Sequence, residues 1–152
     1  MISIKRSNGT DPDFIELVKK LDALLHELDG EDHAFYAQFN KTNLLQHTVI
    51  CYDDIIPIGC GAIKEYSGST MEIKRMFVLP EYRSKGIATA ILHELESWIV
   101  ELNYFNSILE TGKKQIDAIS LYKKNNYKII PNYGQYENIE DSICFKKNLI
   151  DL

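Results

Sequence analysis

The chain is poor in cysteine and in long apolar runs, and each shortage excludes a class of protein. Its three cysteines among 152 residues are odd in number, widely spaced and without a C-x-x-C pair, which argues against a disulfide framework and a zinc site. No apolar stretch approaches the length of a membrane span, and the first residues lack the apolar core of a signal peptide. We therefore expect a cytoplasmic protein, not bound to a membrane, with buried reduced thiols at Cys51, Cys60 and Cys144.

Basic charge is also in short supply. The 17 Lys and Arg residues face 22 Asp and Glu residues, which gives a formal net charge of −5. A general nucleic-acid binder should carry a basic footprint, so we expect no nucleic-acid partner. The acidic excess mildly favours a cationic partner such as an amine, but it is too small to identify one.

Two common phosphate-binding motifs are absent. The basic turn at Arg83–Gly86 lacks the first glycine and the Gly-Lys pair of a Walker A loop. The single G-x-G, at Gly59–Gly61, is followed by Lys64 where a dinucleotide fingerprint needs its third glycine. These departures exclude the P-loop and dinucleotide-binding readings.

The chain does contain a strand, a basic turn with a glycine and a helix in direct succession, over Val78–Ala90. The β-rich run Met71–Leu79 ends at Pro80, which cannot donate to a strand ladder. An amphipathic helix begins at Ile87, and the backbone N–H groups of its first turn have no partner inside the helix. The helix dipole favours negative charge at this end. The stretch therefore predicts a site for a phosphorylated anion.

The hydrophobic pattern predicts one α+β domain over residues 1–152, without repeat or linker. We expect the strands at 45–66 to form an antiparallel meander with the strand 70–79. A strand–helix–strand crossover between Thr70 and Thr111 should place its two strands in parallel. The expected strands are 2–6, 46–53, 58–66, 70–79, 107–111, 127–130 and 142–146, and the expected helices are 10–30, 31–40, 87–102 and 115–125.

The turn Arg83–Ala88 reads R-x-x-G-x-A and resembles the acyl-CoA pyrophosphate loop of the GNAT superfamily of N-acyltransferases. Met71–Val78 is similar to that family's central strand, and Leu109–Thr111 and Ala118–Tyr127 are similar to its next strand and helix. The resemblance implies a three-layer fold with a mixed sheet of about seven strands, flanked by four helices. Its antiparallel meander would be followed by a parallel pair of strands that splay apart.

The resemblance also implies acetyl-CoA as the acyl donor, with no metal. The loop would hold the pyrophosphate through backbone N–H groups, and Gly86 would let the backbone approach closely. The backbone of the central strand would pair with the pantetheine arm, as in strand addition by a ligand. Gln115 stands where the family commonly has Asn. The implied cofactor-binding residues are Met76, Phe77, Val78, Arg83, Ser84, Lys85, Gly86, Ile87, Ala88, Thr89, Gln115 and Tyr122.

Three side chains are the candidate catalytic residues. The resemblance implies that Tyr122 lies near the CoA sulfur, where it would protonate the departing thiolate or donate a hydrogen bond to it. Glu72 and Glu110 are candidate general bases for the acceptor amine, because a partly buried carboxylate can take such a proton directly or through water. Each carboxylate could equally be a paired or surface residue, and water could be the base.

The resulting interpretation is an N-acetyltransferase that moves the acetyl group of acetyl-CoA to a primary amine of a small molecule, amino acid or peptide. The amine would attack the thioester directly, with a backbone N–H at Met76 or Phe77 stabilising the oxyanion. The alternative is a non-catalytic sensor domain of the same fold that binds acyl-CoA or an amine. Family analogy places the acceptor near His26–His33, Tyr36, Tyr133 and Tyr136, and allows a homodimer.

Overall fold

The computed structural model describes residues 1–29 and 44–150. Its strands are β1 (Ile2–Ser7), β2 (His47–Asp53), β3 (Ile56–Ser67), β4 (Thr70–Val78), β5 (Asn106–Gly112), β6 (Lys128–Ile130) and β7 (Ser142–Asn148). Its helices are α1 (Pro12–Asp29), α3 (Ile87–Glu101) and α4 (Ile116–Lys124), with short 3₁₀ turns at η3 (Pro80–Tyr82) and η4 (Gly134–Tyr136).

The number of helices differs from the expectation of four. The described residues hold three α-helices. The fourth, expected over 31–40, and the expected glycine cap at Gly30 lie outside the described residues. The sequence at 31–40 is short and mixed in polarity, so it carries no clear helical period that would have supported the assignment.

All seven strands form one sheet in the order β1-β2-β3-β4-β5-β7-β6. The pairs β2–β3 and β3–β4 are antiparallel, which confirms the meander. The pair β4–β5 is parallel, which confirms the crossover through α3. The remaining pairs, β1–β2, β5–β7 and β6–β7, are antiparallel, so the sheet is mixed as expected.

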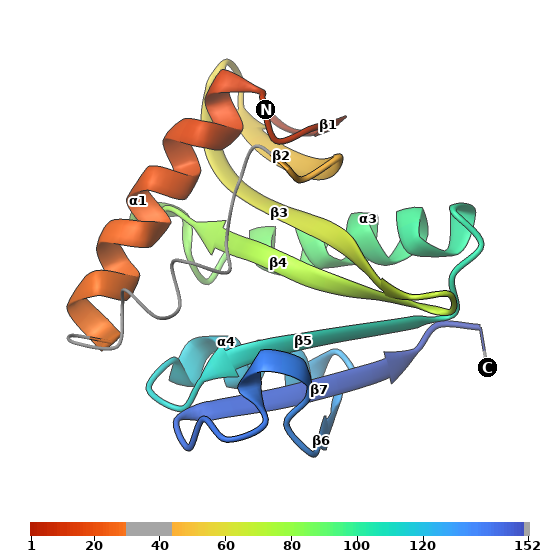
Figure 1. Ribbon diagram of the computed structural model, residues 1–152. Helices are drawn as coiled ribbons and strands as arrows, with labels where there is room; N and C mark the ends of the chain where they lie inside the picture. The colour runs from red at the N-terminus through yellow and green to blue at the C-terminus, as the bar shows by residue number, and fades with distance from the viewer. Residues whose placement is uncertain (30–43, 151–152) are drawn as a thin grey trace.

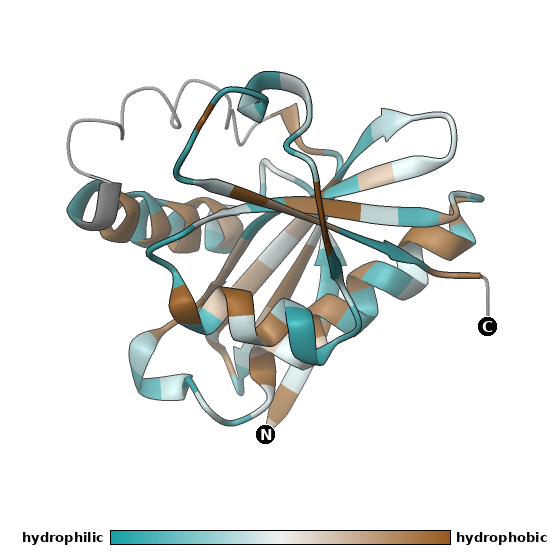
Figure 2. Cartoon of the chain, turned by 90° about the horizontal axis from the view of Figure 1, so that it is seen from below, coloured by the Kyte–Doolittle hydropathy of each residue, from teal (hydrophilic) through white to brown (hydrophobic). Residues whose placement is uncertain are grey.

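The helices cover the two faces of the sheet in separate layers. Helix α1 and turn η4 lie on one face, and α3 and α4 lie on the other (Figure 1). Figure 2 shows the central strands largely in brown and the helices in alternating brown and teal, as expected for amphipathic helices on an apolar sheet. The layer between α1 and α3 therefore holds the hydrophobic core.

Glycines in β3 let α3 pack directly on the sheet. A Cβ atom built on Gly61 would lie 2.6 Å from Met76 Sδ and 2.8 Å from Leu95 Cδ1, and one on Gly59 would lie 2.9 Å from Ile91 Cδ1. The apolar side of α3 fills this space with Ile87, Ile91, Leu92, Leu95 and Ile99. This close packing fixes the position of the helix whose first turn carries the basic loop.

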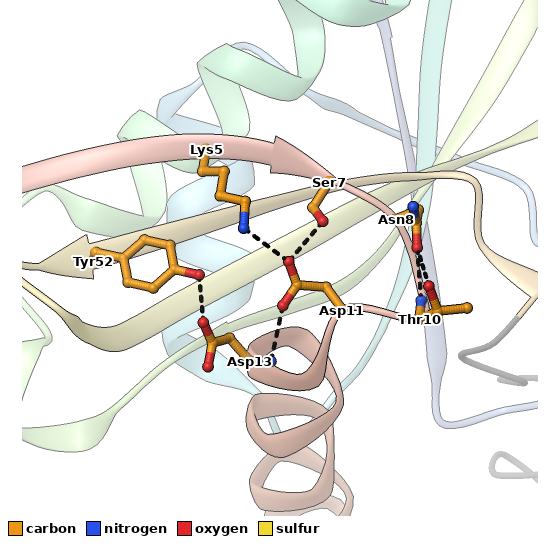
Figure 3. Close-up of polar contacts among 7 residues, drawn as sticks. All are labelled: Lys5, Ser7, Asn8, Thr10, Asp11, Asp13 and Tyr52. Atoms are coloured by element: carbon orange, nitrogen blue, oxygen red, sulfur yellow. Dashed lines mark hydrogen bonds and ion pairs between the residues drawn. The ribbon is translucent and has the colours of Figure 1, made fainter.

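Helix α1 begins at a capping carboxylate. Asp11 Oδ1 accepts a hydrogen bond of 2.9 Å from the backbone N–H of Asp13 (Figure 3), which identifies Asp11 as the N-cap within the predicted start at Thr10–Pro12. Its Oδ2 accepts from Ser7 Oγ at 2.7 Å and from Lys5 Nζ at 3.1 Å. Burial would raise the pKa of Asp11, but the hydrogen bonds from Ser7, the Asp13 amide and Lys5 together hold it below its ordinary value.

The expectations for two helix ends and for the three thiols are also confirmed. Asn103 and Asn126 follow α3 and α4 with φ of 71° and 72°, the left-handed conformation that Asn tolerates at helix ends. The three thiols are free and buried. No helix in the described part of the chain combines the length and apolarity that crossing a membrane requires.

Candidate active site

The parallel strands β4 and β5 separate soon after they meet. Their pairing covers only Thr70–Glu72 against Asn106–Ile108. Beyond Glu72, β4 continues to Val78 and β5 continues to Gly112, and no strand of the described residues pairs with β4 on its β5 side there. A cavity of about 880 Å³ opens where they diverge, and both strands line it. Pairing along the full length of the two strands would have left no such opening.

A β-bulge in β4 accompanies this divergence. The register with β3 shifts opposite Gly61, and Arg75 adopts φ of 60°. A bulge bends its strand and increases the local twist. The buried guanidinium of Arg75 lies 2.7 Å from Asp22 of α1. This contact joins the bent part of β4 to α1, and α1 lines the cavity with Leu21 and its neighbours.

Most of the residues expected at the site line this cavity. The candidate catalytic residues Glu72, Glu110 and Tyr122 all do so. Lys85 does not: its ammonium lies over the ring of Tyr82, 5.5 Å from the ring centroid. The expected cofactor-binding residues that border the cavity are Met76, Phe77, Val78, Arg83, Ser84, Gly86, Ile87, Ala88, Thr89, Gln115 and Tyr122.

The loop before α3 presents free backbone donors. Ser84 and Gly86 have φ of 63° and 80°, and Gly86 is the N-cap without a capping side chain. Among the described residues, none accepts a hydrogen bond from the backbone N–H groups of 84–89. Arg83 Nε donates to Val78 O at 3.0 Å, which holds the loop against the end of β4. Converging N–H groups at a helix N-terminus form a cradle for an anion.

Tyr122 is deeply buried on the α4 side of the sheet. Its ring packs against Tyr127 and Phe145, with centroids 5.7 and 5.9 Å away. Burial, and then the charge of Glu110, raise the pKa of Tyr122 well above its ordinary value of 10.0. A thiol has a pKa of about 8.5, so complete proton transfer from this phenol to a thiolate is uphill. Of the two expected roles, donation of a hydrogen bond to the thiolate fits this environment better.

The carboxylate of Glu72 belongs to a polar cluster on the opposite face. Tyr133 Oη donates to Glu72 Oε2 at 2.6 Å, and Lys74 Nζ lies 3.8 Å from Glu72 Oε1. Lys74 Nζ also lies 3.5 Å from Tyr136 Oη. Burial, and then the charge of Glu72, raise the pKa of Tyr133, so its phenol stays protonated.

Glu110 extends the same cluster from β5. Its Oε2 accepts a hydrogen bond of 2.5 Å from Ser142 Oγ. Burial, then the charges of Glu110 and Glu72, raise the pKa of Tyr136, which also lines the cavity. Burial raises the pKa of the neighbouring Cys144 thiol to about 11, which keeps it un-ionised near neutral pH.

Residues from both faces of the sheet line the cavity. Along the β5–β7 ladder, Glu110 stands opposite Cys144, and Leu109 stands opposite Phe145. Since neighbouring residues of a strand point to opposite faces, the Glu110 cluster and the Phe145–Tyr122 contact lie on different sides. Residues of both sides line the same opening between β4 and β5. A donor on the α4 side could therefore meet an acceptor on the α1 side.

Sequence reasoning missed Lys74. It lies two residues after Glu72 in a strand that is buried almost throughout, so the two charged side chains share one face. Opposite charges two residues apart in a largely buried strand were the available signal. Tyr133 and Tyr136 were anticipated near the acceptor, whereas Tyr36 and the acidic residues after Asp29 lie outside the described residues. Within 1–29 and 44–150, no cluster of His, Cys, Asp and Glu is suited to hold a metal ion.

Comparison with known proteins bears directly on this site. The model of the acetyltransferase (GNAT) family matches residues 15–127. An IAA acetyltransferase of Azospirillum brasilense is 28% identical over 97% of this chain and 98% of its own. A crystal structure from Klebsiella pneumoniae, assigned as an acyl-CoA N-acyltransferase, superimposes with a TM-score of 0.83 at 27% identity over 98% of both chains. A GNAT family acetyltransferase of Elizabethkingia anophelis with acetyl-CoA bound shares the fold, with a TM-score of 0.70 at 18% identity over 97% of both chains.

Proposed function

The chain belongs to the acetyltransferase (GNAT) family and is an acetyl-CoA-dependent acyltransferase, and on that premise we propose that its acceptor is a primary amine of a small molecule, amino acid or peptide. The observation that carries the proposal is the opening between β4 and β5, bordered by Tyr122 on one face and by carboxylates on the other. The amine nitrogen attacks the thioester carbonyl, the C–S bond breaks and CoA leaves as the thiolate.

The donor side of the proposal uses mainly backbone. The free N–H groups of 84–89 hold the pyrophosphate, with Arg83 adding positive charge at the rim. The β5-facing edge of β4 past Glu72 pairs with the amide groups of the pantetheine arm. A backbone N–H at Met76 or Phe77 stabilises the oxyanion, and Tyr122 donates to the thiolate. Gln115 lies at the wall where it can reach the arm.

The acceptor side uses side-chain charge. Glu72 and Glu110 bring two carboxylates to the α1 side of the cavity beside the amine of Lys74, so this cluster carries negative charge whether or not that amine is protonated. Such a site attracts an ammonium group, and the rings of Tyr133 and Tyr136 add aromatic faces beside it. Before attack the ammonium must lose a proton, which Glu72, Glu110 or water could take.

Thiol release from acetyl-CoA tests the proposal. We expect release to depend on an added amine, with mass spectrometry showing one acetyl group on the amine for each thiol formed. The panel should contain amino acids, polyamines, aromatic amines and peptides, with the matching alcohols as controls. Binding of CoA without amine-dependent release for any member would favour the non-catalytic sensor instead.

The proposal treats residues 1–152 as a single domain that works in the cytoplasm, as the sequence predicts. A homodimer also stays a prediction, which light scattering on the purified chain would decide.

A further inference from the structure

We propose that Lys74, as a neutral amine, is the base that takes the proton of the acceptor ammonium. The inference rests on the proposed function and adds a catalytic residue to it. In this proposal Lys74 takes the proton instead of Glu72 or Glu110, and the two carboxylates act through their negative charge.

Lys74 lies where the two strands part. It follows Glu72, the last paired residue of β4, by two positions and shares its face of the strand. Continued pairing would have placed Lys74 opposite Glu110, which follows Ile108 by the same two positions. The side chain is 8% exposed, and Lys74 lines the cavity. Lys74 therefore lines the opening on the same side of the sheet as Glu72.

The contacts of Lys74 are poor for a buried ammonium. Charge-assisted N–H···O bonds are about 2.7–2.9 Å long. Within residues 1–29 and 44–150, the polar contacts of Lys74 Nζ are the 3.5 Å contact with Tyr136 Oη and the 3.8 Å contact with Glu72 Oε1. A buried cation without close partners is costly, whereas a neutral amine tolerates such distances.

Burial and the charges around Lys74 together favour its neutral form. Burial lowers the pKa of Lys74 from 10.5, and the charges of Lys64 and Arg75 lower it further, against the opposing effects of Glu72 and Glu110. Besides these groups, the surrounding elements contribute Tyr133, Tyr136 and Cys144, whose raised pKa values keep them neutral. Protonated Lys74 would be partly compensated by the two carboxylates, so it could both accept and release a proton.

The carboxylates are less free to act as bases. Tyr133 occupies Glu72 Oε2 at 2.6 Å, and Ser142 occupies Glu110 Oε2 at 2.5 Å. Taking a proton on these oxygens would require each hydrogen bond to be rearranged. Lys74 needs no such rearrangement, because Nζ donates to Tyr136 Oη at 3.5 Å and no group in the described part of the chain donates a hydrogen bond to its lone pair.

The proton balance closes without another reactant. The acceptor ammonium gives one proton to Nζ of Lys74, and the freed amine attacks the thioester carbonyl. Collapse of the tetrahedral intermediate breaks the C–S bond, and the proton still on nitrogen passes to the thiolate, directly or through Tyr122 or water. Lys74 then returns its proton to solvent, leaving the acetylated amine and the CoA thiol.

Two substitutions, one neutral and one permanently charged, test this role. Lys74→Met removes the amine at similar volume, and Lys74→Arg keeps a charge that cannot be lost in a protein. Both should lower kcat by roughly 10²-fold at neutral pH with CoA affinity unchanged. Above the pKa of Lys74, the kcat of the parent should no longer rise with pH. The kcat of Lys74→Met should instead keep rising about tenfold per pH unit until the acceptor amine itself is deprotonated. The control Lys128→Met alters an exposed lysine on β6 and should match the parent.

A Lys74→Arg variant with parental kcat would show that Lys74 is not the base, since only its charge would then be needed. The proposed acyltransferase function would be unaffected by that result. NMR titration of protein labelled with ¹³C at lysine Cε gives a readout without turnover. The resonance absent from Lys74→Met should titrate below the ordinary lysine pKa of 10.5, and titration at or above that value would exclude Lys74 as the base. A parent that releases no thiol with any amine would overturn the base and the proposed function together.

Discussion

The two sides of the opening between β4 and β5 are built in different ways. The proposed donor side comes largely from one continuous stretch, from Met76 to Thr89, and would act mainly through backbone N–H groups. The proposed acceptor side brings together β4, β5, the turn around η4 and the start of β7, and would act through side chains. Backbone chemistry leaves a compact motif in a sequence, whereas a cluster assembled from distant segments leaves none.

Loss of the Tyr122 hydroxyl should have the largest effect on the donor side. Tyr122→Phe should lower kcat by roughly 10²-fold and change the Michaelis constant for acetyl-CoA little, because the hydroxyl acts on charge that develops as the thiolate leaves. Steady-state kinetics measure both constants.

Tyr52→Phe is the matched control for Tyr122→Phe. It also removes a phenol, but Tyr52 donates to Asp13 at 2.6 Å beside the start of α1. It should leave kcat unchanged. Equal turnover in Tyr122→Phe and the parent would remove Tyr122 from the chemistry.

A branched side chain in the loop should weaken the donor side by binding rather than by chemistry. Gly86 has φ of 80° with open space around its Cα, so Gly86→Val strains the backbone without a clash. A strain of about 1–3 kcal/mol should distort the N–H cradle and raise the Kd for CoA by roughly tenfold or more. Isothermal titration calorimetry measures this Kd. Gly68→Val, also in open space but without positive φ, should bind CoA like the parent. Unchanged affinity in Gly86→Val would count against the loop as the pyrophosphate site.

The smallest effect is expected far from both sides, at the cap of α1. Asp11→Ala should destabilise the fold by about 1 kcal/mol at neutral pH, with kcat intact, whereas Asp11→Asn should retain most of the cap. The folded-state pKa of Asp11 lies below its ordinary value of 3.8, so its charge contributes stability that is fully present above that pH. The contribution is lost as the pH falls through the folded-state pKa. Thermal melts should show the difference between parent and Asp11→Ala shrinking below pH 3.8; a difference that grows on acidification would contradict this account.

The sequence allowed more to be predicted of the donor side than of the acceptor side. The turn at Arg83–Ala88, the strand before it and the helix after it are local patterns, and the structure places them around one cavity as expected. The parallel pairing of β4 and β5 followed from the crossover rule. The end of that pairing at Glu72 is accompanied by the bulge at Arg75, and no local sequence pattern predicted either feature. Lys85 was expected at the cavity because of its charge, yet its side chain lies over Tyr82.

The acceptor side escaped prediction for a physical reason. The partners of Glu72 and Glu110 are Tyr133 and Ser142, 61 and 32 residues away along the chain. Such contacts form only when β5, β7 and the turn between β6 and β7 are folded together. Glu72 and Glu110 could be named as candidates, but their partners could not.

The short pairing of β4 with β5 also constrains the order of events. Because residues on both faces of the sheet line the opening, the proposed function lets donor and acceptor approach it from different sides, so neither has to leave before the other enters. Donor and acceptor can then occupy the protein together, so double-reciprocal plots at several fixed amine concentrations should intersect. In the proposed arrangement, the acetylated amine would leave on the α1 side of the sheet and CoA on the α4 side.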